Sequence, residues 1–148
     1  MKANPLPDLD CACANLRRAA RLVTQLYSHE MGGQLEPTQF ALLTALDRLP
    51  GSSHVALGEA LGLDKTSLSR NLRLMERNGW VQVAESEDLR RRGYRLTTSG
   101  RRLLTATKPR WKQAQSKLRN LVTSEDWETM QRLLVRVASA ARQAQGRA

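Results

Sequence analysis

Residues 55–81 constrain the fold of this 148-residue chain more than any other stretch. Their sequence, VALGEALGLDKTSLSRNLRLMERNGWV, places a glycine between two segments of helical apolar periodicity, which predicts two short helices joined by a tight turn. Asp64 stands where a capping side chain accepts a hydrogen bond from a backbone N–H group. Leu68, Leu72 and Met75 recur on one side of the second helix, so this side is expected to pack against the domain.

The other side of the second helix is polar and basic. The major groove of B-DNA admits one α-helix, and long cationic side chains can bind the O6 and N7 atoms of guanine. This side therefore predicts a surface that reads DNA, although a helix of this kind taken alone, without the turn, the wing and the net charge, is more typical of an ordinary solvated surface. The candidate DNA-binding residues on it are Lys65, Thr66, Ser67, Ser69, Arg70 and Arg73.

The charge of the chain favours a polyanionic partner. The sequence has 24 Lys and Arg residues against 14 Asp and Glu residues, a formal net charge of +10. Such an excess is typical of proteins that bind nucleic acid, but also of some that bind anionic membranes and some that are merely basic. Charge alone therefore does not choose between these classes.

Periodicity predicts further helices on both sides of the pair. Apolar side chains in residues 9–32 recur at steps of three and four, and this helix is expected to end at a glycine pair. A short packing helix begins near Pro37. Of the two helices expected after residue 98, the first contains Pro109, which is expected to bend or break it, and the second begins with a capping box at residues 123–126.

The pattern between residues 79 and 98 changes from helix to strand. Residues 80–83 and 93–97 suit a two-stranded hairpin, or wing, with residues 85–92 as its polar tip. Arginine at such a tip suits a narrow minor groove or DNA phosphates, and the candidates are Arg90, Arg91 and Arg92. The sequence thus predicts a mainly α fold with a small β-wing, a winged helix-turn-helix with additional N- and C-terminal helices.

Taken together, these segments resemble the MarR family of winged-helix transcriptional regulators over nearly the whole chain. The most specific pieces are residues 63–81, the motif Asp88-Leu89-Arg90 in the wing, and the motif Leu96-Thr97-x-x-Gly100 that closes it. The resemblance implies a single MarR-like domain over residues 1–148, with a winged helix-turn-helix part at about 35–100 and dimerisation helices at about 9–32 and 101–146.

The family resemblance also implies a function. It indicates a homodimer that binds a pseudo-palindromic operator in double-stranded DNA, acts as a repressor, and is released by a small-molecule effector or by cysteine oxidation. The apolar stripes of the first and last helices support the dimer independently, since one small winged domain does not need both to cover itself. The two recognition helices would lie roughly 34 Å apart, one turn of DNA.

Two cysteines, Cys11 and Cys13, are a candidate redox-sensing site together with Tyr27. In the hydroperoxide-sensing branch of the MarR family, a reactive cysteine lies near the start of the first helix and a tyrosine lies near the position of Tyr27. Arg17 and the segment Glu36-Pro37-Thr38 stand where that branch has two other tyrosines. A thiol at a helix N-terminus gains thiolate character from the helix dipole. The alternative is that both cysteines are small apolar residues of the helix seam.

Other classes of function have weaker support. His29 and His54 lie far apart and lack paired ligand spacing, so no metal or other cofactor is expected. No catalytic constellation stands out, and we do not expect an enzyme. No apolar run approaches the ~18 residues of a membrane span, and the N-terminus lacks the pattern of a signal peptide, so a cytoplasmic protein is expected. The alternatives that remain are a thiol-dependent redox enzyme using the two cysteines and a non-specific nucleic-acid-binding protein.

Overall fold

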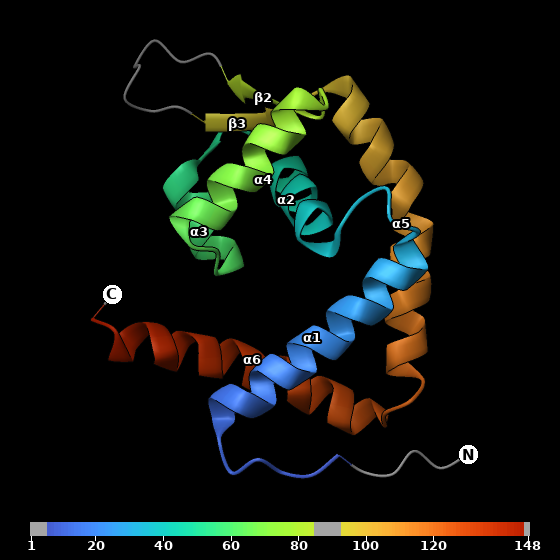
Figure 1. Cartoon of the computed structure of the whole chain (residues 1–148), viewed down its shortest axis with the longest axis vertical. Coiled ribbons are helices and arrows are strands. Elements are labelled where there is room, and N and C mark those ends of the chain that lie inside the picture. Colours follow the sequence, from blue (N-terminus) through green and yellow to red (C-terminus); the bar gives the residue numbers. More distant parts are fainter. Residues whose placement is uncertain (1–5, 85–92, 147–148) are drawn as a thin grey trace. The chain divides into compact units, whose positions relative to one another are not determined.

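The computed structural model describes residues 6–84 and 93–146 (Figure 1). It has two compact units, residues 1–111 and 112–148, and we describe each by itself. Helices dominate the described residues, with one small antiparallel sheet of three strands. This confirms the predicted fold class.

Helix α1 (Ala12–Met31) opens the first unit. It begins three residues later than the Leu9 start that periodicity suggested, because Asp10 has a positive φ of 51° that interrupts the helical conformation. The Asp8 carboxylate holds this turn, accepting hydrogen bonds from the backbone N–H of Asp10 at 3.0 Å and from the Asn15 amide at 2.8 Å. At the other end α1 stops, as expected, at Gly32, which is in the left-handed conformation.

Three helices build the core of the first unit: α2 (Pro37–Arg48), α3 (His54–Leu61) and α4 (Lys65–Arg77). Leucines of all three helices point into the core, where α3 packs against α4. The predicted packing face of α4 is buried, and its members have at most 1% of their surface exposed. They contact a cluster that also contains Leu42, Leu43, Leu46 and Leu57. Burial of these side chains fixes the orientation of α4 and leaves its opposite side outward.

The sheet has the strand order β1-β3-β2, formed by β1 (Ser52–Ser53), β2 (Val81–Ala84) and β3 (Gly93–Leu96). The predicted hairpin is present, with Val81 opposite Leu96. The expectation of only two strands was wrong, because Ser52 and Ser53 also pair with β3. This third strand depends on a close approach of two glycines, since a Cβ atom on Gly93 would collide with the carbonyl group of Gly51.

The motif Leu96-Thr97-x-x-Gly100 joins the sheet to helix α5 (Thr98–Arg119). The Thr97 hydroxyl donates to the carbonyl oxygen of Gly79 at 2.5 Å and accepts from the backbone N–H of Gly100 at 3.0 Å. Gly100 must lack a side chain because a Cβ atom there would collide with the carbonyl group of Trp80. Helix α5 is continuous through Pro109, so the break, one of the two effects expected of this proline, is absent. Its flanking turns remain helical, with Leu104 and Thr107 buried before the proline.

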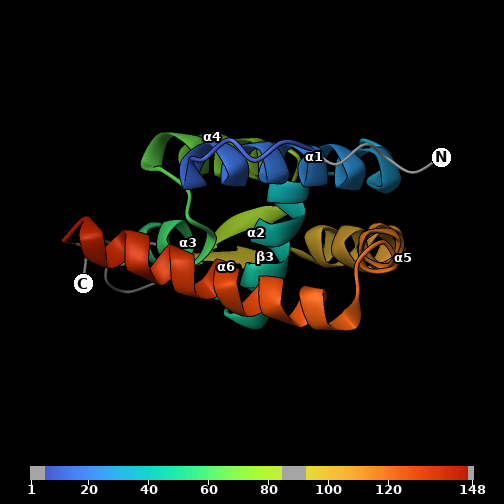
Figure 2. The ribbon, with the colours of Figure 1, turned by 90° about the horizontal axis from the view of Figure 1, so that it is seen from below.

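The second unit contains the end of α5 and helix α6 (Ser124–Ala144). The Thr123 hydroxyl caps α6 by accepting a hydrogen bond from the backbone N–H of Asp126 at 3.0 Å, which is one of the two hydrogen bonds of the predicted capping box. Figure 2 shows α6 as one unbroken helix. No residue within α6 is buried, although Leu133, Leu134 and Val137 lie along it.

Candidate nucleic-acid interface

Helix α4 begins with a fully formed cap. One oxygen of the Asp64 carboxylate accepts from the backbone N–H of Ser67 at 2.9 Å, and the other accepts from the Ser67 hydroxyl at 2.6 Å. These hydrogen bonds, that of the Ser67 hydroxyl first, lower the pKa of Asp64 below its ordinary value. The first turn of α4 is therefore well ordered at neutral pH, and the backbone positions from which its side chains extend are fixed.

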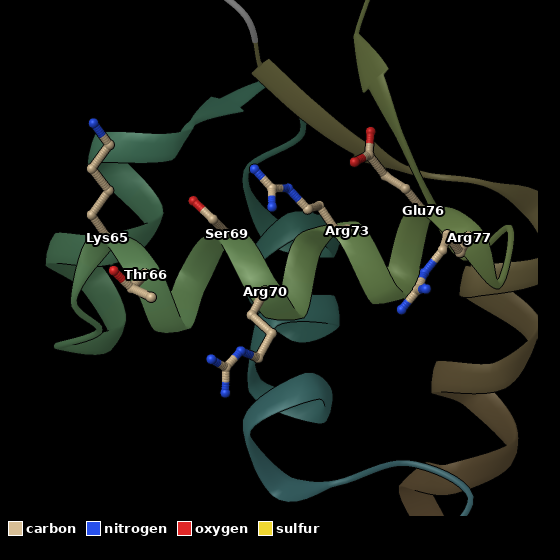
Figure 3. A pocket seen from close by; sticks show the side chains of 7 residues that line it. All are labelled: Lys65, Thr66, Ser69, Arg70, Arg73, Glu76 and Arg77. Atoms are coloured by element: carbon tan, nitrogen blue, oxygen red, sulfur yellow. The ribbon is translucent and has the colours of Figure 1, made fainter.

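The outward side of α4 forms a shallow hollow at the surface (Figure 3). In Figure 3, Lys65, Ser69 and Glu76 rise along one edge of the helix, and Arg70 and Arg77 extend from the other. Four of its seven lining residues are cationic, against one carboxylate, so the hollow attracts anions. It is lined by Lys65, Thr66, Ser69, Arg70, Arg73, Glu76 and Arg77.

The cations of this surface are available to a ligand. Within residues 6–84 and 93–146, the side chains of Lys65, Arg70 and Arg73 form no hydrogen bond or ion pair, and all three are exposed. A guanidinium group carries five N–H donors in a planar fork that matches phosphate oxygens and the edge of guanine. The surface can therefore bind a nucleic acid without first breaking internal ion pairs.

The predicted recognition residues do not all have the same surroundings. Lys65, Thr66, Ser69, Arg70 and Arg73 line the hollow together. Ser67 does not line it, because its hydroxyl group donates to Asp64 and it is half-buried. Sequence reasoning omitted Glu76 and Arg77, which lie at helical spacing from Arg73 and could have been found by extending the polar stripe one turn.

A further residue beside the hollow was considered from the sequence only as a metal ligand, a role that its spacing did not favour. His54, the first residue of α3, has its Nε2 atom 2.9 Å from the hydroxyl oxygen of Ser69. No sequence pattern relates these two positions, which lie fifteen residues apart. Their contact arises from the packing of α3 on α4.

The predicted wing-tip residues, Arg90, Arg91 and Arg92, lie outside the described residues. The base of the wing is described. There Gln82 on β2 faces Arg95 on β3, and with its amide oxygen toward the guanidinium it accepts hydrogen bonds at 2.9 and 3.2 Å. This cross-strand pair stabilises the register of the hairpin from which the tip extends.

Tyr27 and the two cysteines of the candidate redox site lie at different ends of α1. Cys11 is the N-cap of α1 with an extended backbone, Cys13 lies in the first turn, and both are exposed free thiols. Tyr27 is half-buried on the same helix, and burial raises the pKa of its hydroxyl. The rise of an α-helix separates positions 13 and 27 by about 21 Å, so a contact between them would require two chains.

Metal binding and membrane insertion were not expected from the sequence. Across residues 6–84 and 93–146, no three His, Cys, Asp or Glu side chains are grouped so that they could hold a metal ion. In the same ranges, no helix is both long enough and apolar enough to cross a membrane.

Known proteins agree with this geometry. Residues 34–92 match the sequence model of the MarR family. The transcriptional regulator HosA of Escherichia coli O127:H6 (strain E2348/69 / EPEC) is 30% identical over 120 residues, which cover 80% of this chain and 88% of HosA. The crystal structure of the M. tuberculosis transcriptional regulator MosR in complex with DNA is 32% identical with a TM-score of 0.81, and the match covers 90% of this chain and 98% of MosR.

A second solved structure extends the likeness. The PcaV transcriptional regulator from Streptomyces coelicolor, in complex with its natural ligand, is 25% identical with a TM-score of 0.81, and the match covers 93% of this chain and 99% of PcaV. The motifs, the fold and these relatives lead to one conclusion: the chain belongs to the MarR family of DNA-binding, winged-helix transcriptional regulators.

Proposed function

We propose that this protein is a homodimeric, sequence-specific repressor that binds a pseudo-palindromic operator in the cytoplasm. The observation that carries the proposal is the outward side of α4, where exposed cations that have no partner among the described residues surround two short hydroxyl side chains. Cations supply affinity for phosphates, and side chains that reach base edges supply specificity. A surface with both kinds of group is suited to reading a sequence.

Each group on α4 has a distinct proposed role. Arg70 and Arg73 donate to guanine in the major groove, and Thr66 and Ser69 reach base edges from the same helix. Lys65, beside the helix N-terminus, binds a backbone phosphate. Ser67 positions the helix through its hydrogen bonds to Asp64. The wing contributes Arg90, Arg91 and Arg92 to phosphates or to the adjacent minor groove.

The proposed dimer is supported by the apolar side chains of α1 and α6. Most helices in proteins are stabilised by burying an apolar face, yet α6 has no buried residue. On α1, Leu16, Leu22 and Val23 are also exposed. Two copies of the chain related by a two-fold axis would cover these faces with identical partners. The same axis would present two α4 helices to the two halves of a palindrome.

Release from DNA has two proposed routes. The first is binding of a small-molecule effector that lowers the affinity for DNA; the PcaV structure in complex with its natural ligand motivates this route. The exposed pair of thiols favours a second route, in which a hydroperoxide is the oxidant. The thiolate of one cysteine attacks the peroxide, the O–O bond breaks, and an alcohol leaves after taking up a proton. The other thiol, or a thiol of the second chain, then attacks the sulfur of the resulting sulfenic acid, and its S–O bond breaks to give a disulfide and water.

Competition binding tests the DNA-reading role. Sequences selected by the protein from random duplexes are measured against random DNA at one fixed, near-physiological salt concentration. A sequence-specific regulator binds selected DNA roughly 10³-fold or more tightly. Equal affinities would replace the proposal with non-specific nucleic-acid binding.

The remaining parts of the proposal have their own measurements. Analytical ultracentrifugation must give a dimer, and Leu134→Glu on α6 must shift it toward monomer. Binding repeated with hydroperoxide, with reductant and with Cys11→Ser and Cys13→Ser separates thiol control from ligand control. Catalytic turnover of peroxide by the purified protein, rather than a stoichiometric reaction, would instead support a thiol-dependent enzyme.

A further inference from the structure

We infer that His54 is a specificity-determining positioning residue of the DNA interface, acting through the hydroxyl group of Ser69. This inference rests on the proposed sequence-specific binding. His54 belongs to α3, outside the hollow on α4, and its imidazole Nε2 lies 2.9 Å from the Ser69 oxygen. Ser69 itself lines the hollow. The pair therefore connects a half-buried residue behind the interface with a hydroxyl group at its surface.

The chemistry of the hydroxyl group explains why this connection matters. A serine hydroxyl has one hydrogen to donate and can also accept, so a freely rotating serine binds almost any base edge and discriminates little. Hydrogen bonding to His54 removes this freedom. Where Nε2 is the bare nitrogen, Ser69 donates to it and presents an acceptor to the groove. Where Nε2 carries the hydrogen, Ser69 accepts through one of its two lone pairs and keeps its hydrogen to donate. The first case requires a donor on the base, and the second favours an acceptor on the base.

The backbone next to His54 is held by the sheet and by the cap of α3. His54 directly follows β1, in which Ser52 and Ser53 pair with Tyr94 and Gly93 of β3. The Ser53 hydroxyl then caps α3 by accepting from the backbone N–H of Ala56 at 3.1 Å. The backbone of His54 is thus held on both sides, so the position from which its side chain extends is defined. The strand that the sequence did not predict, β1, is the element that holds it.

The inference predicts a change at one base position. Selection with the wild-type protein first gives the base preference at each operator position. The position at which Ser69→Ala abolishes this preference is the one that Ser69 reads. His54→Phe keeps a ring of similar size and removes the nitrogen atoms. It should relax preference at that same position by about two- to tenfold, the range expected for one hydrogen bond. The double variant should bind as Ser69→Ala does alone.

Two further variants complete the design. His54→Gln places an amide near the position of Nε2 and should restore a preference at the Ser69 position. His29→Phe is the matched control, because His29 is exposed on α1 and should leave every preference unchanged. Thermal unfolding verifies that each variant is folded, and His54→Ala replaces His54→Phe if the latter is not.

The outcomes are distinguishable. A wild-type protein without any sequence preference would refute the proposed function itself. A wild-type preference that Ser69→Ala leaves intact at every position would overturn the inference alone. So would a His54→Phe loss that is uniform over all positions, or one that persists unchanged in the Ser69→Ala background, because either result would show that His54 only supports packing.

Discussion

Replacement of Arg70 by alanine separates base reading from simple charge attraction. Arg70 is exposed on α4, lines the hollow, and forms no ion pair within the described residues. Its removal therefore breaks no internal interaction there, and the free energy of unfolding should hardly change. Any loss of function should be confined to the DNA complex.

The expected loss on selected DNA follows from the geometry of the guanidinium group. A bidentate arginine–guanine contact is worth about 1–3 kcal/mol of discrimination, which corresponds to roughly 5- to 150-fold in affinity. On random DNA, Arg70 can offer only a phosphate contact. Its removal there should weaken binding less and lower the slope of log affinity against log salt by about 0.9.

Fluorescence anisotropy with labelled duplexes at one salt concentration measures both losses. Arg21→Ala is the matched control, because it removes the same charge from an exposed position on α1, away from α4. The control should affect selected and random DNA equally and only slightly. If Arg70→Ala loses the same factor on both DNAs, Arg70 binds phosphate and the assignment of base reading to it is incorrect.

Three other substitutions probe the wing, the joint and the cap. Arg91→Ala should weaken binding to selected and random DNA alike in the same assay. The reason is that a wing-tip arginine is expected to contact phosphates or the minor groove, where different base pairs present similar hydrogen-bonding groups; a loss confined to selected DNA would contradict this. Gly100→Ala should lower the free energy of unfolding by about 1–3 kcal/mol in denaturant titration, because its Cβ atom meets the Trp80 carbonyl group; unchanged stability would show that the backbone relaxes freely. The folded-state pKa of Asp64 is lowered, so its contribution to stability is complete above the ordinary value of 3.8 and is lost as pH falls through the lowered value. Asp64→Asn keeps a capping acceptor that does not titrate, and stability measured from pH 7 down to 2 should lose the part of its slope that comes from this group.

The sequence predicted the elements whose signals are local. Residues 63–81 contain a cap, an apolar stripe and a terminal glycine, and all three act within one helix or at its ends. The predicted hairpin also agrees, since apolar residues of β2 and β3 face each other in the observed register. Periodicity and capping reflect interactions between residues that lie a few positions apart in the sequence, and these local interactions determine the structure of both segments.

The sequence did not predict features that depend on distant contacts. Strand β1 has only two residues, both serine, and forms because Gly51 and Gly93 allow two backbones to meet. The contact between His54 and Ser69 likewise exists only after α3 has packed on α4. For Ser67, the residue type suggested a base contact, whereas its hydroxyl group donates to Asp64. Spacing alone does not distinguish a serine that is hydrogen-bonded to the capping residue from a serine whose hydroxyl group points outward.

Methylation interference on a selected operator tests the central claim most directly, because dimethyl sulfate modifies guanine N7 in the major groove and adenine N3 in the minor groove. If two α4 helices read the major groove, N7 methylation should block binding at two symmetric clusters, centred about ten base pairs apart. Arg70→Ala should remove interference at one guanine of each cluster. A single cluster, or interference from adenine N3 alone, would contradict a dimer that reads DNA through α4.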